Sequence, residues 1–126
     1  MTRPMTTGRR VWVAASADAG VVLLFVAIGR SSHDDDANAV SGALGVAAPF
    51  LIALVAAWLI GRVWLRPLSW RSGLVVWVAT VVGGVLLRRF LFDRSTATGF
   101  IVVATIFLGV LHNGWRALAR RRFSEV

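Results

Sequence analysis

The stretch VSGALGVAAPFLIALVAAWLIG, residues 40–61, contains no charged side chain. At 1.5 Å of helical rise per residue it extends about 33 Å, which matches the ~30 Å hydrocarbon core of a bilayer. Three further apolar runs of similar length lie before and after it, with few charges in each. We therefore predict an all-α integral membrane bundle of four transmembrane helices, at about residues 11–29, 40–61, 73–92 and 97–115, in one domain covering residues 1–126.

The composition supports this class and excludes others. Of the 126 residues, 57% are hydrophobic and 16% are charged, whereas a soluble domain carries about 25% charged residues. Disorder requires low hydrophobicity, and the strands of a membrane barrel alternate apolar and polar residues, which these runs do not. Cys and Lys are both absent, so disulfides, thiolate metal sites and lysine Schiff bases are excluded.

The first apolar run could instead be a cleaved signal peptide, since Arg9 and Arg10 precede it and Ala15-Ser16-Ala17 resembles a cleavage site. Only Val11–Ala14 would then form the apolar segment, and about 7–15 residues are needed. We interpret the run as a retained membrane helix.

The charges predict how the helices are oriented. Short connections make successive helices antiparallel neighbours. All 14 basic residues are Arg, and ten of them fall on the side that holds the N-terminal tail, the 62–72 connection and the C-terminal tail. The positive-inside rule then puts both termini in the cytoplasm, in a multi-pass protein of the plasma membrane. We therefore expect the net charge of +8 to set the orientation of the helices and to interact with the headgroups of the lipid bilayer. No nucleic-acid partner is expected.

Tryptophan agrees with this orientation, because its amphipathic ring favours the membrane interface. Four of the tryptophans lie near the predicted cytoplasmic boundary: Trp12, Trp64, Trp70 and Trp115.

The run at residues 40–61 also carries small or compact residues at every fourth position. The members of this small-residue stripe are Gly45, Pro49, Ala53, Ala57 and Gly61. Helices in lipid associate through close packing, so small residues mark contact faces. We expect the stripe to be buried inside the bundle; the alternatives are contact with a second copy, giving a homo-oligomer, or with a larger membrane partner.

Asp18 is the most informative single residue. An acidic side chain inside a membrane helix is costly and normally faces a partner or a polar cavity. We expect His112 and Asn113, which lie at a similar depth in the last run, to form an intramembrane polar cluster with it. Arg62 and Arg116 are long enough to reach the same region. A structural hydrogen bond or ion pair is the favoured interpretation, and a proton-linked or cation-binding site is the alternative.

The opposite face carries a second group of polar residues. Arg30, Arg88 and Arg89 are candidates for an anion-attracting rim, together with His33; the alternative is that the arginines extend to lipid headgroups. His33 is followed by Asp34–Asp36, but consecutive carboxylates point in different directions and do not define a coordination shell. We predict no metal site, no cofactor and no catalytic residue, since no motif of a known enzyme class is present.

With these residues identified, the chain resembles a family of small four-helix bacterial and archaeal membrane proteins, catalogued as domain of unknown function 3054. The resemblance covers about Val11 to Arg121. It rests on Asp18, Gly29-Arg30-x-x-His33, Pro49-Phe50, the stretch from Arg88-Arg89 to Thr96-Ala97, and Gly114-Trp115-Arg116. It implies an integral membrane protein without an established activity, and it draws attention to Asp18, Arg30 and His33.

Three functions stay open at this stage. The first is a small oligomeric transporter or channel-like component with Asp18 at its polar centre. The second is a structural or accessory subunit that packs against a larger membrane partner. The third is a membrane enzyme acting on lipid at the outer face, which the residues support least.

Overall fold

The computed structural model describes residues 7–31, 39–91 and 98–122, and every long element in these ranges is a helix. The predicted all-α, four-helix architecture is confirmed. The long helices are α1 (Thr7–Ser31), α2 (Ala39–Gly61), α3 (Trp70–Leu86) and α4 (Thr98–Arg122). A 3₁₀ turn, η1 (Val63–Leu65), lies between α2 and α3, and a π-helical segment, η2 (Leu87–Leu91), extends α3.

The helix ends differ from the sequence-based bounds. α1 begins at Thr7 instead of about residue 11, and α4 continues to Arg122 instead of ending near residue 115. Apolar content marks the part of a helix that suits lipid, but Ala, Leu and Arg are good helix formers and extend α4 further. α3 begins at Trp70 because Ser69 caps it: the Ser69 hydroxyl accepts a hydrogen bond from the Ser72 backbone N–H at 3.1 Å.

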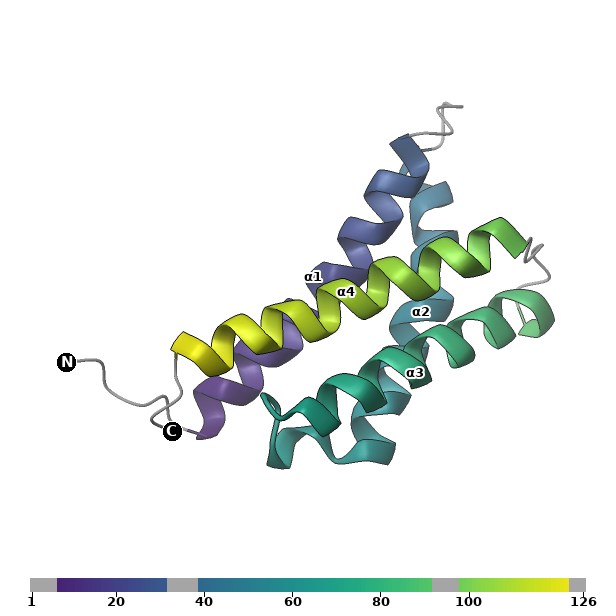
Figure 1. Ribbon diagram of the computed structural model, residues 1–126. Helices are drawn as coiled ribbons and strands as arrows, with labels where there is room; N and C mark the ends of the chain where they lie inside the picture. The colour runs from purple at the N-terminus through teal and green to yellow at the C-terminus, as the bar shows by residue number, and fades with distance from the viewer. Residues whose placement is uncertain (1–6, 32–38, 92–97, 123–126) are drawn as a thin grey trace.

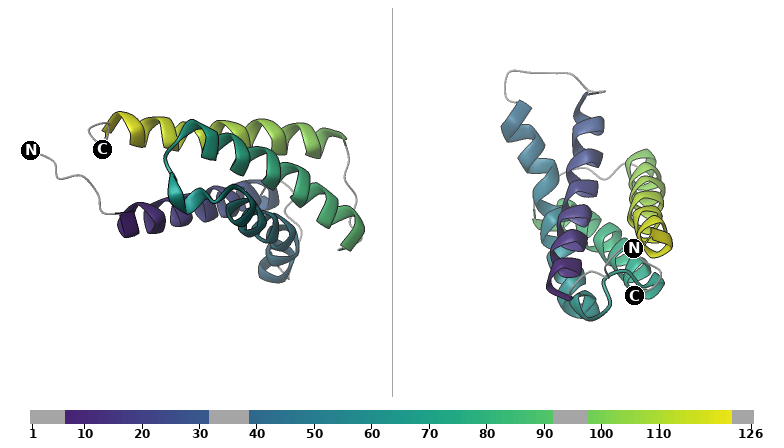
Figure 2. Two further views of the ribbon diagram at one scale, coloured as in Figure 1. Left: turned by 90° about the horizontal axis from the view of Figure 1, so that it is seen from below. Right: turned by 90° about the vertical axis from the view of Figure 1, so that its left-hand side faces the viewer.

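The four helices pack as two crossing pairs. α3 and α4 run side by side along their lengths, and α1 and α2 form a second pair behind them (Figure 1). Figure 2 shows the same pairs from two other sides. α2 makes its most extensive contact with α3, and α1 also contacts α4. The first turn of α1 and the last turn of α4 therefore lie at the same end of the bundle.

Aromatic rings and glycines build the core in one half of the bundle. Phe25 of α1 meets Phe50 of α2 edge to face at 5.7 Å between centroids, and Phe107 of α4 lies 5.5 Å from Phe25. Phe50 packs directly on Gly84 of α3, where any added Cβ would overlap its ring. The pairs of helices can cross this closely because Gly84 carries no side chain.

The small-residue stripe of α2 lies largely inside the bundle. Pro49, Ala53 and Ala57 are buried and Gly45 is half-buried, while Gly61 is exposed. An added Cβ on Gly83 of α3 would lie 2.9 Å from Cβ of Ala53, so this part of the stripe touches α3 of the same chain.

Three of the helices are long and apolar enough to cross a membrane. These segments are Gly8–Ile28, Trp70–Phe90 and Ile101–Arg121. The apolar segment Gly45–Gly61 of α2 is shorter.

Candidate functional site: a buried carboxylate cluster

Asp18 lies on the inward face of α1, completely buried. Ala14, Val22 and Phe25 share that face, since residues three, four and seven apart lie on one side of a helix. An ionised carboxylate in such a position is tolerated only when other groups pair with it. The contacts of Asp18 therefore decide what this region of the molecule can do.

Arg116 of α4 supplies the opposite charge. Its Nη1 donates to Oδ1 of Asp18 at 2.7 Å, and its Nη2 donates to Oδ2 at 2.6 Å. Both side chains are fully buried. Two parallel hydrogen bonds from one guanidinium to one carboxylate are the strongest and most directional form of ion pair in proteins.

Three further side chains complete the shell of the carboxylate. Nδ1 of His112 lies 2.9 Å from Oδ1, and the indole N–H of Trp115 donates to the same oxygen at 3.0 Å. The indole N–H of Trp58, from α2, donates to Oδ2 at 2.9 Å. We call Asp18, Trp58, His112, Trp115 and Arg116 the Asp18 cluster.

These contacts leave the carboxylate with no open position. A carboxylate has about four lone-pair sites, and here three donors meet Oδ1 while two meet Oδ2. Because an indole nitrogen is a donor only, both tryptophans favour the ionised acid. Asp18 is thus held as an acceptor and is not exposed as a nucleophile or a base.

His112 has one nitrogen in the cluster and one outside it. Nδ1 carries the proton that faces Asp18, because the carboxylate can only accept. Nε2 is buried and has no hydrogen-bond partner among the described residues.

The same arginine ties the cluster to the connection between α2 and α3. Nε of Arg116 donates to the backbone carbonyl of Pro67 at 2.8 Å. One turn later, Nη1 of Arg120 donates to the carbonyl of Leu68 at 2.7 Å. The guanidinium of Arg116 also lies 4.6 Å from the ring centroid of Trp115, within cation–π range. One charged residue therefore joins α1, α4 and the α2–α3 connection.

The structure brings together two of the four residues expected in the intramembrane cluster. Asp18 and His112 meet, as described above. Asn113 turns elsewhere, because its Nδ2 donates to the carbonyl of Gly109 at 2.9 Å and its Oδ1 faces Gly73 of α3. Arg62 is exposed with a left-handed backbone (φ 49°) and lies outside the cluster. Of the two arginines that are long enough to reach this region, Arg116 joins the cluster and Arg62 does not.

Sequence reasoning missed the two indoles. Trp115 was assigned to the membrane interface, and Trp58 was not singled out. One signal was present in the sequence: His112, Trp115 and Arg116 are spaced i, i+3 and i+4 and so lie on one helix face, whereas Asn113 is about 100° away around the helix.

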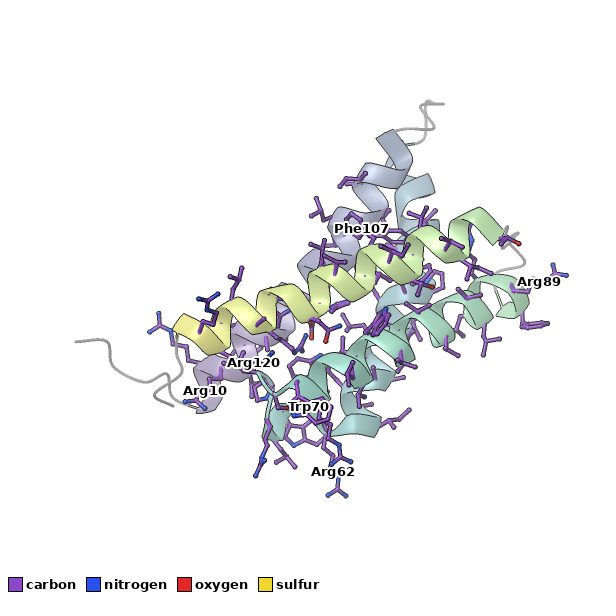
Figure 3. All side chains as sticks on the ribbon, in the orientation of Figure 1. Arg10, Arg62, Trp70, Arg89, Phe107 and Arg120 are labelled. Atoms are coloured by element: carbon purple, nitrogen blue, oxygen red, sulfur yellow. The ribbon has the colours of Figure 1, made fainter. Side chains whose placement is uncertain are left out.

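The rim expected at the opposite face is only partly within the described residues. Arg88 is half-buried and Arg89 is exposed, both in the π-helical segment η2. Figure 3 shows Arg89 at the far end of the bundle from Arg10 and Arg120. The side chain of Arg30, and His33 with Asp34–Asp36, lie outside the described residues. Among the side chains that the structure describes, no three His, Cys, Asp or Glu residues gather as a metal site would require.

Comparison with known proteins places the chain in a family. The family model described as "Protein of unknown function (DUF3054)" matches residues 15–119. The chain belongs to this family. All five residues of the Asp18 cluster lie inside the match, while Arg120 and Arg121 lie just beyond it. No curated protein and no solved structure matches this DUF3054 member.

Proposed function

We propose that this protein is a multi-pass protein of the cytoplasmic membrane, in which α1–α4 all cross the bilayer and both termini face the cytoplasm. The exposed surface supports this proposal: Ile60 of α2, Phe90 beside α3 and Leu118 of α4 are each more than two-thirds exposed. Soluble monomers rarely expose contiguous apolar patches of more than a few hundred Å². Lipid is the solvent in which such a surface is stable.

Within that membrane protein, the role we propose for the Asp18 cluster is structural. The observation that carries the proposal is that every acceptor position of the Asp18 carboxylate is occupied: fully buried His112 and Arg116 and half-buried Trp58 and Trp115, from α2 and α4, surround both oxygens. A transport site must exchange its partners for a substrate, whereas a closed shell favours one arrangement of the helices. The protein then serves as a compact structural or accessory component of the membrane.

A double-mutant cycle tests the structural role. Removing one partner of a buried ion pair leaves the other charge uncompensated, so Asp18→Asn and Arg116→Gln should each lower the free energy of unfolding by about 3–5 kcal/mol. The double variant, which removes both charges, should cost clearly less than the sum. Unfolding is measured in detergent micelles by tryptophan fluorescence.

The control for this cycle is Arg71→Gln, which removes an exposed arginine near the start of α3 and should change stability by less than about 0.5 kcal/mol. Strictly additive costs for Asp18→Asn and Arg116→Gln would contradict a structural ion pair.

A second candidate function, proton-coupled transport, is favoured by one observation. Nε2 of His112 is a buried ring nitrogen with no partner among the described residues, and the other nitrogen of the ring lies beside a carboxylate. Such a nitrogen could receive a proton or a substrate donor, and intramembrane ionisable residues often mark proton pathways.

A flux measurement separates the two candidates. The protein is reconstituted into liposomes that carry a pH gradient and a trapped pH-sensitive dye. The structural proposal predicts that the gradient decays as slowly as in protein-free liposomes. Faster decay that is slowed again by His112→Gln would replace the structural role with transport.

A further inference from the structure

A groove runs along the outside of the bundle between α1 and α4. Its volume is about 660 Å³. Gly20 and Gly114 contribute to its wall from the two helices, and an added Cβ on either glycine would meet no atom within 4 Å. The groove exists because these two positions carry no side chain.

The length of the groove corresponds to one leaflet of a bilayer. On α4 its lining extends from Val110 to Arg121, a rise of about 16 Å at 1.5 Å per residue. The hydrocarbon core of a bilayer is ~30 Å thick, so half of it is about 15 Å. The groove thus spans the distance from the headgroup level to the middle of the membrane.

Positive charge is confined to one end of the groove. Arg121 lines that end, is exposed, and makes no hydrogen bond or ion pair with any residue that the structure describes. Arg10 and Arg120 lie at the same end of the bundle (Figure 3), and Nε of Arg10 is buried without a partner in the described part of the chain. The remaining lining is apolar, with Leu24 and Val110 at the opposite end.

We propose that this groove binds one anionic phospholipid from the cytoplasmic leaflet, with an acyl chain along Gly20 and Gly114 and the phosphate at Arg121. The inference rests on the membrane location proposed above. Its basis is the combination of an apolar channel one leaflet long with a cation at the headgroup end, since anionic lipids attract arginine at the cytoplasmic surface. The smaller groove between α1 and α2 is lined by residues such as Leu51 and Trp58 and has no arginine, so it should not prefer anionic lipid.

Native mass spectrometry tests the proposal on the full chain. Purified protein in detergent is mixed with phosphatidylglycerol or with phosphatidylcholine. We expect retention of one phosphatidylglycerol per chain and little retention of phosphatidylcholine. Equal retention of both lipids, or none of either, would overturn the proposal, as would a second copy of the chain that occupies the groove and is lost in Gly114→Leu.

Three variants locate the lipid. Gly114→Leu should abolish phosphatidylglycerol retention by filling the groove, and Arg121→Gln should weaken it about fivefold. Gly99→Leu is the matched control, because Gly99 is exposed on the same helix, away from the groove, with no atom near an added Cβ. Circular dichroism confirms that each variant keeps its helix content. Retention that survives Gly114→Leu and Arg121→Gln would place the lipid elsewhere and overturn the inference.

The purification itself separates this inference from the proposed function. Protein that requires detergent for extraction yet retains no phosphatidylglycerol refutes the lipid site alone. Protein recovered in the soluble fraction without detergent refutes the membrane location, and the lipid site with it.

Discussion

At the scale of single residues, Trp58 and Trp115 each direct an indole N–H toward the same buried carboxylate. Tryptophan in a membrane helix is usually interpreted as an interface anchor. Here the two rings also satisfy a charge, together with Arg116 and His112. Asp18 is therefore stabilised by several donors from two helices, and the loss of any one should be measurable.

Trp58→Phe should lower the free energy of unfolding by about 1.5–3 kcal/mol, the usual range for a hydrogen bond to a charged group. The phenyl ring keeps most of the packing but cannot donate to Oδ2 of Asp18. Denaturant unfolding in detergent measures the change. Trp12→Phe is the control, because Trp12 is 75% exposed; equal losses in the two variants would show that the hydrogen bond of Trp58 contributes nothing.

The cluster was partly predictable from the sequence. Depth along the helices predicts Asp18 and His112 at one level, because helical rise per residue is fixed, and in the structure the two side chains are in contact. Depth alone does not say which way a side chain points, so Asn113 was expected in the cluster although it faces α3. Arg62 and Arg116 are both long cations near the same end, and only the spacing of Arg116 from His112, four residues along one helix face, distinguishes the two in the sequence.

At the scale of elements, α3 and α4 approach closely because glycine stands where a side chain would intervene. Trp77 of α3 lies over Gly109 of α4, and its indole N–H donates to the carbonyl of Thr105 at 2.9 Å. An added Cβ on Gly109 would lie 2.6 Å from Cε2 of Trp77. The indole ring of Trp77 is rigid, so an added Cβ at that distance could be accommodated only by a shift of α3 relative to α4.

Gly109→Ala should therefore destabilise the fold by about 1–3 kcal/mol, the range for overpacking a filled site. Gly114→Ala is the matched control five residues further along α4, where nothing lies within 4 Å of the new Cβ. Alanine should be neutral or should stabilise α4 there by up to about 1 kcal/mol. Thermal unfolding of both variants provides the comparison, and an equal effect at both positions would exclude close packing as the cause.

The helices themselves were the most predictable part of the molecule. The central part of each helix could be predicted because an apolar run of bilayer length can satisfy its backbone in lipid only as a helix or in a closed barrel. Their ends were less predictable: α4 continues through Arg116 and Arg120 because hydrogen bonds to the α2–α3 connection hold it in place. Those partners lie about 50 residues away in sequence, so the local sequence around α4 does not predict these hydrogen bonds.

At the scale of the whole molecule, the arginines and the aromatic core lie in different halves of the bundle. Arg116 of the Asp18 cluster lies in the last two turns of α4 and, like Arg120, bonds the α2–α3 connection; Figure 3 shows Arg10 and Arg120 at this end of the bundle. The aromatic core formed by Phe25, Phe50 and Phe107 occupies the other half. The arginine-rich end is the one that we proposed above to face the cytoplasm.

Both proposals depend on helices that span the membrane, and cysteine labelling in intact cells can detect that arrangement. The chain has no native Cys, and Gly8 and Gly99 are both exposed at opposite ends of the bundle with no atom within 4 Å of an added Cβ. An impermeant maleimide should label Gly99→Cys in intact cells, and should label Gly8→Cys only after the membrane is opened. Labelling of Gly8→Cys in intact cells, or of neither variant until lysis, would contradict the account.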